Sequence, residues 1–477
     1  METINMRECA AAMGVRQLPG FGEKVYSEGL PVDAVVTDSR KVTPGCLFVA
    51  LEGETFDGHD FISSALEKGA ACAVAHREQN YGADRVLYVD NTLKALQRLS
   101  GWYRRRFSVR MAGVTGSVGK TSTKEMIYAV LSSRYNTLKT MGNLNNEIGL
   151  PQTLLQLSRE HEAAVVERGM SGPGEIRELT LLARPELAVI TNVGVSHIEH
   201  LGSRENILKA KWEITEGLHT GATVLLNGDN DLLQNLQSGD FQLLFYGIDN
   251  PGVQIRARDV AEGLNQTRFT ICWKGEEYPA VIPCIGRHNV LNALAAFGVG
   301  VSFGILPEQC AQAVSRYQTT GMRQHIVRRG SYTVVEDCYN ANPDSMRAAL
   351  TTLEEYRDEG VRRKIAVLAD MLEPVSYTHL VVVKQVPEAG AKVMKGDTVL
   401  LYTEESDTET AKVPNVVGRT LQEANEILTN AGFQVSYTPE DIEGKSAVVA
   451  AQSPSYDAEV PKKTVIELEL SLTTPSA

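Results

Sequence analysis

Short apolar runs alternate with helix-like stretches between residues 108 and 318. The runs are RMAGVTG, EAAVVERG, ELAVITNVG and ATVLLNGD. Each has the length of a buried strand, and strands that alternate with helices favour a largely parallel sheet covered on both faces. We therefore predict an α/β fold with a parallel-sheet domain at its centre.

The stretch TGSVGKTST, residues 115–123, follows the first of these strands and opens a helix. The backbone N–H groups of such a glycine turn can wrap an anionic phosphate, with Lys120 on the β- and γ-phosphates and the Thr121 hydroxyl on Mg²⁺. The strict pattern has glycine where this chain has Val114, and the alternative is a Gly/Ser turn with a solvated lysine. The strand before the turn and the helix after it favour a phosphate loop. The residues expected to bind ATP here are Thr115, Gly116, Ser117, Gly119, Lys120, Thr121 and Ser122.

Charge and cysteine content exclude several classes of protein. The formal net charge is −12, which disfavours a nucleic-acid binder but leaves room for a nucleotide in a local pocket. The seven cysteines all lie before residue 374 and show no C-x-x-C spacing, which is typical of reduced, structural thiols. The chain shows no signal-peptide pattern and no apolar run long enough to span a bilayer. We expect a cytoplasmic protein with no membrane segment.

The chain changes character at residues 374–380. Before this junction, SYTVVED, a helix from Pro343 to Tyr356 and a strand KIAVLAD form a unit that would leave an open sheet edge and an uncovered face. After it, residues 381–477 hold 8 lysines and arginines against 15 aspartates and glutamates. QVPEAGAKVMKGDTVLLY from Gln385 aligns with QSPSYDAEVPKKTVIELEL from Gln452. This part therefore contains an internal repeat, whose first copy lacks its beginning.

The second copy of the repeat predicts a small α+β module. TLQEANEILTNAGF is an amphipathic helix with Ala424, Ile427 and Leu428 inward and Gly432 as its C-cap. The runs AVVAAQ and TVIELEL predict strands of an antiparallel sheet.

The order of the remaining motifs identifies a family. TDSRKVTPGCLFVAL precedes the phosphate loop, and GNLNNEIGLP, VVERGMSGPGEI, TNVGVSHIEHLGSRENILKAKWEI, GRHNVLNALAA and EDCYNANPDSM follow it in turn. Residues 1–373 thereby resemble the Mur ligases of peptidoglycan synthesis, and most of all the members that add D-alanyl-D-alanine. The resemblance implies a UDP-sugar-binding N-terminal α/β domain over residues 1–107, a central P-loop ATPase domain over 108–318, and a truncated, Rossmann-like C-terminal domain over 319–373.

The chemistry implied by the resemblance is carboxylate activation. ATP would phosphorylate the terminal carboxylate of UDP-N-acetylmuramoyl-tripeptide, and the amine of D-alanyl-D-alanine would attack the acyl phosphate. Several negative oxygens must meet there, so cations have to be held nearby. The matching positions assign catalysis to Lys120, Glu167, His197 and Lys211, and Mg²⁺ binding to Thr121, Glu167, His197 and Lys211. Lys211 would act as a carbamate, because an ammonium group cannot coordinate Mg²⁺.

The remaining site residues also rest on the resemblance. ATP contacts are implied for Asn289, Arg323, Asp337, Tyr339 and Asn340, and substrate contacts for Ser39, Arg40, Asn143, Asn145 and Asn146. Outside the family context, Glu167 reads as a solvated charge, His197 as a structural histidine, Lys211 as an exposed helix lysine and Asn289 as a helix cap. One departure is Arg168, where the family usually carries an apolar residue. This cation would either weaken Mg²⁺ binding or point to the other face of its strand.

Beyond the junction, residues 404–477 resemble a PASTA domain, with a partial copy over 381–403. The resemblance implies binding of peptidoglycan or muropeptides outside the cell. No S-x-x-K motif accompanies this part, so the resemblance does not imply transpeptidase activity. VSYTHL resembles translated adapter DNA, so we hypothesise a chimeric reading frame whose product is poorly soluble or inactive. The alternatives are a natural fusion, a related Mur or folylpolyglutamate-type ligase, a non-catalytic peptidoglycan-binding PASTA protein, and a generic P-loop ATPase.

Overall fold

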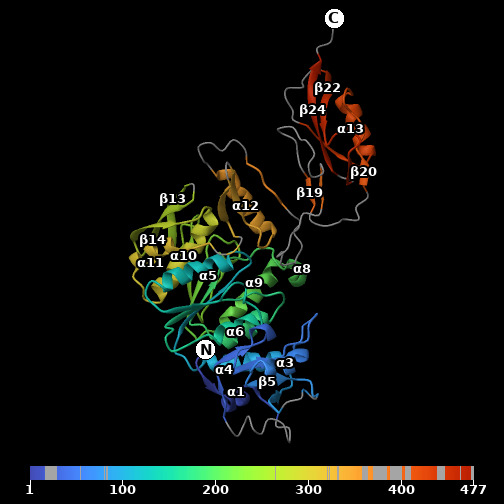
Figure 1. Cartoon of the computed structure of the whole chain (residues 1–477). Helices are drawn as coiled ribbons and strands as arrows, with labels where there is room; N and C mark the ends of the chain where they lie inside the picture. The colour runs from blue at the N-terminus through green and yellow to red at the C-terminus, as the bar shows by residue number, and fades with distance from the viewer. Residues whose placement is uncertain are drawn as a thin grey trace. The chain divides into compact units, whose positions relative to one another are not determined.

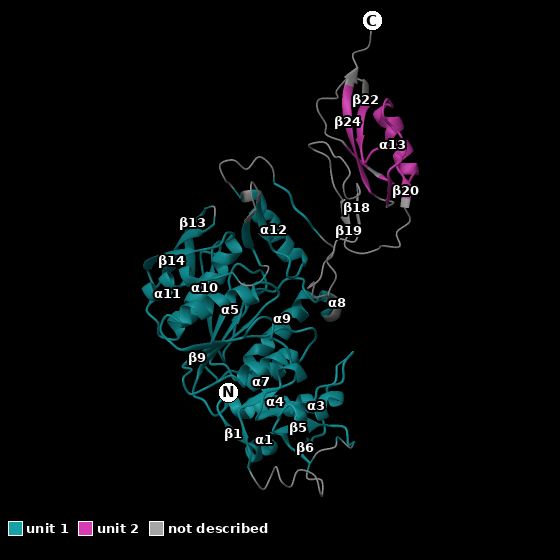
Figure 2. Ribbon diagram, in the orientation of Figure 1, with its two compact units in different colours: residues 1–376 teal, residues 377–477 magenta. Residues whose placement is uncertain are grey.

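The chain divides into two compact units, residues 1–376 and 377–477 (Figure 2). The division falls inside the predicted junction. A computed structural model describes residues 1–16, 29–53, 55–79, 81, 84–263, 265–319, 321, 323–329, 332–356, 364–368, 384–386, 400–402, 410–437, 446–461 and 464–473. Within these residues, no helix combines the length and the apolar character that a membrane crossing requires.

The N-terminal domain is built on a parallel sheet in the order β3-β4-β5-β6. Both faces of this sheet are covered, which is why its strands read as unbroken apolar runs. Leu47 and Val49 pack with helices α1 and α4, whereas Phe48 packs on the other face with helix α3. The elements are β1 (Ile4–Asn5), α1 (Met6–Met13), β2 (Pro31–Val32), β3 (Ala34–Val36), β4 (Cys46–Val49), α3 (Ile62–Glu67), β5 (Cys72–Ala75), β6 (Val86–Tyr88) and α4 (Thr92–Arg104).

The described part of the central domain holds a sheet in the order β15-β14-β13-β12-β11-β10-β7-β9-β8. Strands β8 to β13 and β7 run parallel, and β14 and β15 are antiparallel. The prediction of a largely parallel sheet is therefore confirmed. Its strands are β7 (Arg110–Thr115), β8 (Thr137–Lys139), β9 (Ala163–Glu167), β10 (Leu187–Ile190), β11 (Thr223–Asn227), β12 (Gln242–Gly247), β13 (Ile255–Glu262), β14 (Thr267–Trp273) and β15 (Glu276–Ile282).

Helices cover both faces of this sheet (Figure 1). On β7, Ala112 and Val114 pack in the core that includes α5 and α10, whereas Met111 packs in the core that includes α4, α6 and α7. Strand β7 is thus buried on both sides and ends at the phosphate loop. The helices are α5 (Lys120–Leu131), α6 (Gly149–Leu154), α7 (Glu175–Ala183), α8 (Ile198–Leu201), α9 (Arg204–Trp212), α10 (Arg287–Ser302) and α11 (Pro307–Ala313).

We name residues 1–376 the ligase unit after the family that they resemble, and the third segment of this unit, from residue 319, is small in its described part. Strands β16 (His325–Arg329) and β17 (Tyr332–Glu336) form an antiparallel pair, and helix α12 (Pro343–Glu355) follows. The predicted strand KIAVLAD is wrong over its described residues 364–368, which have no regular secondary structure. Ile365 is 65% exposed and Val367 74% exposed. An extended segment without a neighbouring strand has no partner for its backbone groups, so the apolar run alone does not make it a strand.

The second unit has its own core. Helix α13 (Leu421–Asn430) buries Ala424 and Leu428, with Gly432 left-handed just after the cap residue Ala431. Its sheet has the order β21-β24-β22. The predicted strands AVVAAQ and TVIELEL are β22 and β24, which pair antiparallel as predicted, and β21 adds a strand that runs parallel to β24. The strands are β18 (Lys384–Val386), β19 (Leu400–Tyr402), β20 (Thr410–Lys412), β21 (Gln434–Tyr437), β22 (Ser446–Ser453), β23 (Glu459–Pro461) and β24 (Val465–Thr473). Most of the predicted partial repeat lies outside the described residues.

Arg168 points away from the predicted metal site. A Cβ atom on Gly113 would lie 1.9 Å from Arg168 Nη1, and Gly113 shares its sheet face with Met111, opposite to α5. Arg168 is completely buried, and none of its guanidinium nitrogens has a hydrogen-bond partner in the described structure. Burial lowers the pKa of Arg168 to about 9. Arg168 therefore points to the other face of its strand, which is one of the two outcomes expected from the sequence.

Replacing Arg168 by methionine should therefore stabilise the ligase unit. The substitution removes a buried, unpaired charge. Burial of this charge lowers the free energy of unfolding by on the order of 1–3 kcal/mol, even when the guanidinium relaxes. We expect a melting temperature a few degrees higher in calorimetry. The matched control is Arg104→Met, because buried Arg104 donates to the carbonyls of Ala183, Phe107 and Val109; its loss should lower the melting temperature. Equal destabilisation by both substitutions would contradict this interpretation.

Candidate active site

The phosphate loop is a tight turn between strand β7 and helix α5. Gly116 has φ 155° and Gly119 has φ 80°, and the second is the left-handed residue at which α5 begins. A Cβ atom on Gly116 would lie 1.9 Å from Thr191 Oγ1, at the end of the neighbouring strand β10. Glycine is therefore required at residue 116 by contact and at residue 119 by backbone conformation.

The groups around this turn suit an anion. The N–H groups of Ser117 and Val118 both donate to Asn192 Oδ1 at 2.9 Å. Lys120 Nζ donates to the carbonyls of Gly116 at 2.9 Å and Ser117 at 3.2 Å. One oxygen thus accepts two neighbouring backbone N–H groups beside a lysine ammonium, which is the arrangement that a phosphate oxygen requires.

Glu167 ends strand β9 beside the loop and is 1% exposed. Its Oε1 accepts hydrogen bonds from Thr121 Oγ1 at 3.1 Å and Asn145 Nδ2 at 2.8 Å. Its Oε2 is buried and accepts no hydrogen bond from the described residues. A buried carboxylate oxygen left available next to a threonine hydroxyl fits a hard divalent cation, so these two predicted Mg²⁺ ligands lie together.

Lys211 lies at the end of α9 and is 1% exposed, so the expectation of an exposed helix lysine does not apply. Burial is the main cause that lowers the pKa of Lys211 well below its ordinary value, and the positive charge of Lys120 lowers this pKa further. A lowered pKa increases the fraction of neutral amine at neutral pH, and the neutral form is the one that reacts with carbon dioxide. The residue therefore fits the predicted carbamate chemically.

His197 has φ 65° and precedes helix α8. The loop before it contacts two distant parts of the chain, because Gly194 N–H donates to Ser117 Oγ at 2.9 Å and Val195 N–H donates to Asp344 Oδ2 at 3.0 Å. Asp344 belongs to α12, so the third segment of the ligase unit contacts the loop that leads to His197.

A cavity of about 260 Å³ joins the phosphate loop to the third segment. Among the predicted site residues, its described lining includes Ser117, Gly119, Lys120, Thr121, Ser122, Asn145, Glu167, Asn289, Arg323, Asp337, Tyr339 and Asn340. The described lining does not include Thr115, Gly116, His197, Lys211, Asn143, Asn146, Ser39 or Arg40. In the part of the chain that the structure describes, no group of three or more His, Cys, Asp or Glu side chains could hold a metal ion.

The cavity lining includes a chain of polar side chains, Asn289, Gln324 and His288, of which the sequence indicated only Asn289. Asn289 Nδ2 donates to Gln324 Oε1 at 2.7 Å, and Gln324 Nε2 lies 3.0 Å from His288 Nε2. Burial lowers the pKa of His288 to about 4, so the ring is neutral. Arg323 stacks over the ring of Tyr339, 4.1 Å from its centroid. These neutral polar groups and the stacked cation suit a heterocyclic base.

The asparagines of GNLNNEIGLP divide by role. Asn145 contacts Glu167, whereas Asn146 Oδ1 accepts from Gly149 N–H at 2.9 Å and from Ile148 N–H at 3.3 Å. Asn146 therefore stabilises the start of α6. Asn143 accepts the Asn145 N–H through its backbone carbonyl.

The predicted UDP-sugar residues lie in the N-terminal domain. Arg40 is 87% exposed and pairs with Asp38 at 2.9 Å, and the Ser39 carbonyl accepts from Lys68 Nζ at 3.0 Å. Both residues follow strand β3 at its carboxyl end, which is where ligands bind in open parallel sheets.

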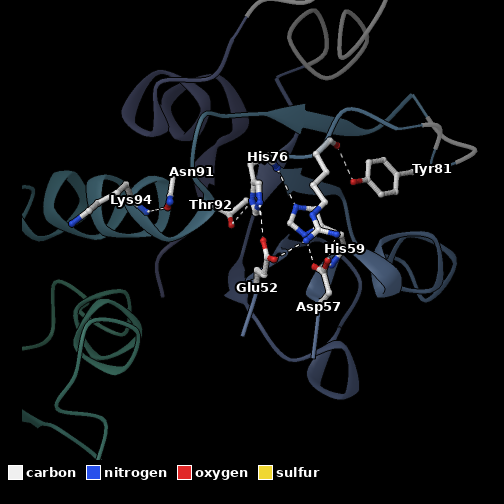
Figure 3. A network of polar contacts seen from close by, with 9 residues as sticks. Glu52, Asp57, His59, His76, Tyr81, Asn91, Thr92 and Lys94 are labelled. Atoms are coloured by element: carbon white, nitrogen blue, oxygen red, sulfur yellow. Dashed lines mark hydrogen bonds and ion pairs between the residues drawn. The ribbon is translucent and has the colours of Figure 1, made fainter. Parts of the chain in front are cut away.

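A polar network braces the same edge of that sheet (Figure 3). His59 is 2% exposed; its Nδ1 lies 2.5 Å from Asp57 Oδ1, and its Nε2 accepts the His76 N–H at 3.2 Å. Nδ1 therefore carries the proton. Arg77 bridges Glu52 and Asp57 at 2.7 and 2.6 Å, and His76 Nε2 lies 3.2 Å from Glu52. The network joins the loops that follow β4 and β5.

Fold and site together define a nucleotide-binding α/β enzyme with a P-loop at the end of a central parallel strand. Family models refine this class. The Mur ligase family catalytic domain matches residues 31–104, the Mur ligase middle domain 114–300, the Mur ligase glutamate ligase domain 322–429 and the PASTA domain 411–472. The chain belongs to the Mur ligase family.

Individual relatives support the same assignment. UDP-N-acetylmuramoyl-tripeptide–D-alanyl-D-alanine ligase of Bacillus subtilis is 44% identical over 348 residues, which are 72% of this chain and 74% of that protein. A crystal structure of MurF from Acinetobacter baumannii is 29% identical with a TM-score of 0.69, covering 75% of this chain and 78% of that one. MurF ligase from Thermotoga maritima in complex with ADP is 30% identical with a TM-score of 0.63, covering 67% and 74%. These comparisons give no support to an inactive product or to a non-catalytic protein.

Two family models overlap at residues 411–429. Most of α13 lies in this overlap, and its Ala424 and Leu428 pack with Val449, Ile466 and Leu468 of the second unit. We therefore assign the overlap to the PASTA domain. The C-terminal ligase domain is partly present.

Replacing Glu167 by glutamine should weaken Mg²⁺-dependent ATP binding about tenfold or more, because an amide replaces one of two carboxylate oxygens and removes the negative charge. Titration calorimetry with ATP at varied Mg²⁺ concentration measures the effect. Glu178→Gln is the control, since Glu178 is 53% exposed and pairs with Lys94. Unchanged Mg²⁺ dependence in Glu167→Gln would rule out Glu167 as a ligand.

Proposed function

We propose that the chain is an ATP-dependent ligase that joins D-alanyl-D-alanine to UDP-N-acetylmuramoyl-tripeptide. The observation that carries this proposal is the cavity in which the phosphate loop and Glu167 face Arg323, Asp337 and Asn340 of the third segment. An anion site, a carboxylate with an available oxygen and a polar base site in one cavity support transfer of a phosphoryl group from ATP. The Bacillus subtilis relative carries the name of this reaction.

Residues of the central domain and of the third segment share the chemistry. Lys120 and the loop N–H groups hold the β- and γ-phosphates, and Asn289, Tyr339 and Arg323 hold the base end of ATP. Thr121 and Glu167, which lie together, would hold Mg²⁺ with His197 and carbamylated Lys211 as further ligands, and the bound ion would neutralise charge on the phosphoryl oxygens. The tripeptide carboxylate takes the γ-phosphate to form an acyl phosphate, ADP leaves, and attack by the dipeptide amine releases phosphate.

The muramyl precursor extends from this cavity towards the N-terminal domain. Ser39 and Arg40 bind its UDP-sugar end, and Asn143, Asn145 and Asn146 contact its peptide. Gln152 Nε2 donates to Thr37 Oγ1 at 2.8 Å, and this contact links the helix after those asparagines to the loop that carries Ser39. Because ATP and UDP-linked precursors are cytoplasmic, we propose that the ligase acts there.

The PASTA domain at residues 411–472 binds muropeptides in this proposal, independently of ligation. We also propose the domain boundaries that the sequence predicts, which are residues 1–107, 108–318 and 319–373, a junction at 374–380, a partial PASTA repeat at 381–403 and a PASTA domain at 404–477. A chimeric origin remains a hypothesis, and a long DNA read across codons 365 to 390 of the source genome tests it.

Ligation predicts a strict substrate dependence. Purified full-length protein should release phosphate from ATP only when UDP-N-acetylmuramoyl-tripeptide and D-alanyl-D-alanine are both present, because the acyl phosphate forms on the tripeptide carboxylate and loses its phosphate when the dipeptide amine attacks it. A coupled phosphate assay measures this. Phosphate release in the absence of both substrates indicates a generic ATPase. Phosphate release when another amino acid replaces D-alanyl-D-alanine indicates a related ligase.

Carbamylation of Lys211 predicts a spectroscopic signal. The neutral amine becomes more abundant as pH rises through a pKa that burial has lowered, so the carbamate should form at neutral pH with ¹³C-bicarbonate. We expect a carbamate ¹³C resonance in the full-length protein that Lys211→Ala abolishes, whereas exposed Lys209→Ala retains it. Persistence of the resonance in Lys211→Ala would assign it to another lysine.

A further inference from the structure

Lys124 is a completely buried lysine on helix α5, one turn after the phosphate-loop lysine. Its Nζ donates to the Thr140 carbonyl at 2.8 Å and to the Gly142 carbonyl at 3.5 Å. It also lies 3.0 Å from Glu125 Oε1 and 3.7 Å from Glu167 Oε2. An ammonium group that is removed from water costs free energy, so its surroundings have to supply oxygen atoms on several sides.

The loop that Lys124 contacts is wrapped around Glu167. Thr140 Oγ1 accepts the Glu167 N–H at 3.0 Å, and Asn145 Nδ2 donates to Glu167 Oε1 at 2.8 Å. The Asn145 carbonyl also accepts the Gly169 N–H at 2.9 Å. The segment from 140 to 145 therefore touches Glu167 or the chain just after it at three points, and Lys124 attaches the start of that segment to α5.

The two positive charges of Lys124 and Lys139 are matched by the two negative charges of Glu125 and Glu167. Glu125 is 7% exposed and also pairs with Lys139. Lys124 also forms an ion pair with Glu167 through Oε2, the carboxylate oxygen that accepts no hydrogen bond from the described residues. At 3.7 Å the ammonium attracts this oxygen without a hydrogen bond, so it orients the carboxylate and leaves the oxygen available for coordination.

We propose that Lys124 is a positioning residue, which holds the 140–146 loop and the Glu167 carboxylate in the geometry that binds Mg²⁺ and the precursor peptide. Helix α5 begins at the phosphate loop. The hydrogen bonds of Lys124 therefore attach the segment that carries Asn143, Asn145 and Asn146 to the helix that forms part of the nucleotide site. Lys124 does not touch the reacting atoms. This role deepens the proposed function and rests on it.

The test uses Lys124→Met in the full-length protein, with steady-state kinetics in each substrate and in Mg²⁺. Loss of the ammonium should raise the apparent KM for the muramyl tripeptide and for Mg²⁺ by about tenfold or more. The KM for ATP should change less than about threefold, because the loop N–H groups and Lys120 are left in place. Lys94→Met, at a half-exposed lysine of α4, should behave as the unmodified protein.

A second variant separates positioning from folding. Lys124→Met combined with Glu125→Gln removes one positive and one negative charge, so it should recover most of the thermal stability lost in the single variant. The raised KM values should persist, since the contacts to Thr140 and Gly142 are still missing. Recovery of KM together with stability, or normal KM values in the single variant, would overturn the proposal. If the unmodified protein shows no ligation, the proposed function fails instead.

Discussion

Strand β7 can lead into helix α5 only through a turn whose backbone passes directly against the end of strand β10. A side chain on Gly116 would overlap the Thr191 hydroxyl, and Gly119 adopts a conformation that other residues disfavour. This close approach brings the ends of β7, β9 and β10 to one place at the carboxyl edge of the sheet. The phosphate loop, Glu167 and Asn192 converge there because the sheet order puts β7 between β9 and β10.

The site is built from buried charges, which a stable fold otherwise avoids. Lys124, Glu125, Glu167 and Lys211 are all at most 7% exposed. Burial of such groups costs free energy that pairing only partly offsets, and clusters of this kind are common where an active site has to hold a cation or shift a pKa. Arg168 shows the contrast: it is equally buried, has no described hydrogen-bond partner for its guanidinium, and faces away from the site.

The third segment of the ligase unit contains the part of the C-terminal ligase domain that is present. Its described strands pair only with each other, and Ile365 and Val367 remain exposed. It nevertheless supplies Arg323, Asp337, Tyr339 and Asn340 to the cavity, and Asp344 to the loop before His197. The residues predicted to contact the base of ATP therefore line the cavity even though the ligase domain is only partly present.

Local patterns determined much of this protein from the sequence alone. The turn at residues 115–123, the strand before it, the helix after it and the amphipathic helix at 421–430 depend on the dihedral preferences and periodicity of adjacent residues. The tertiary structure alone decided which distant groups meet. Asn145 reaches Glu167 across 22 positions, and Lys124 approaches Glu167 and the loop that carries Asn145 from helix α5. Arg168 takes the opposite face, β21 pairs in parallel with β24, and residues 364–368 form no strand. These outcomes depend on sheet order and on whether a partner strand lies alongside, and no local pattern carries that information.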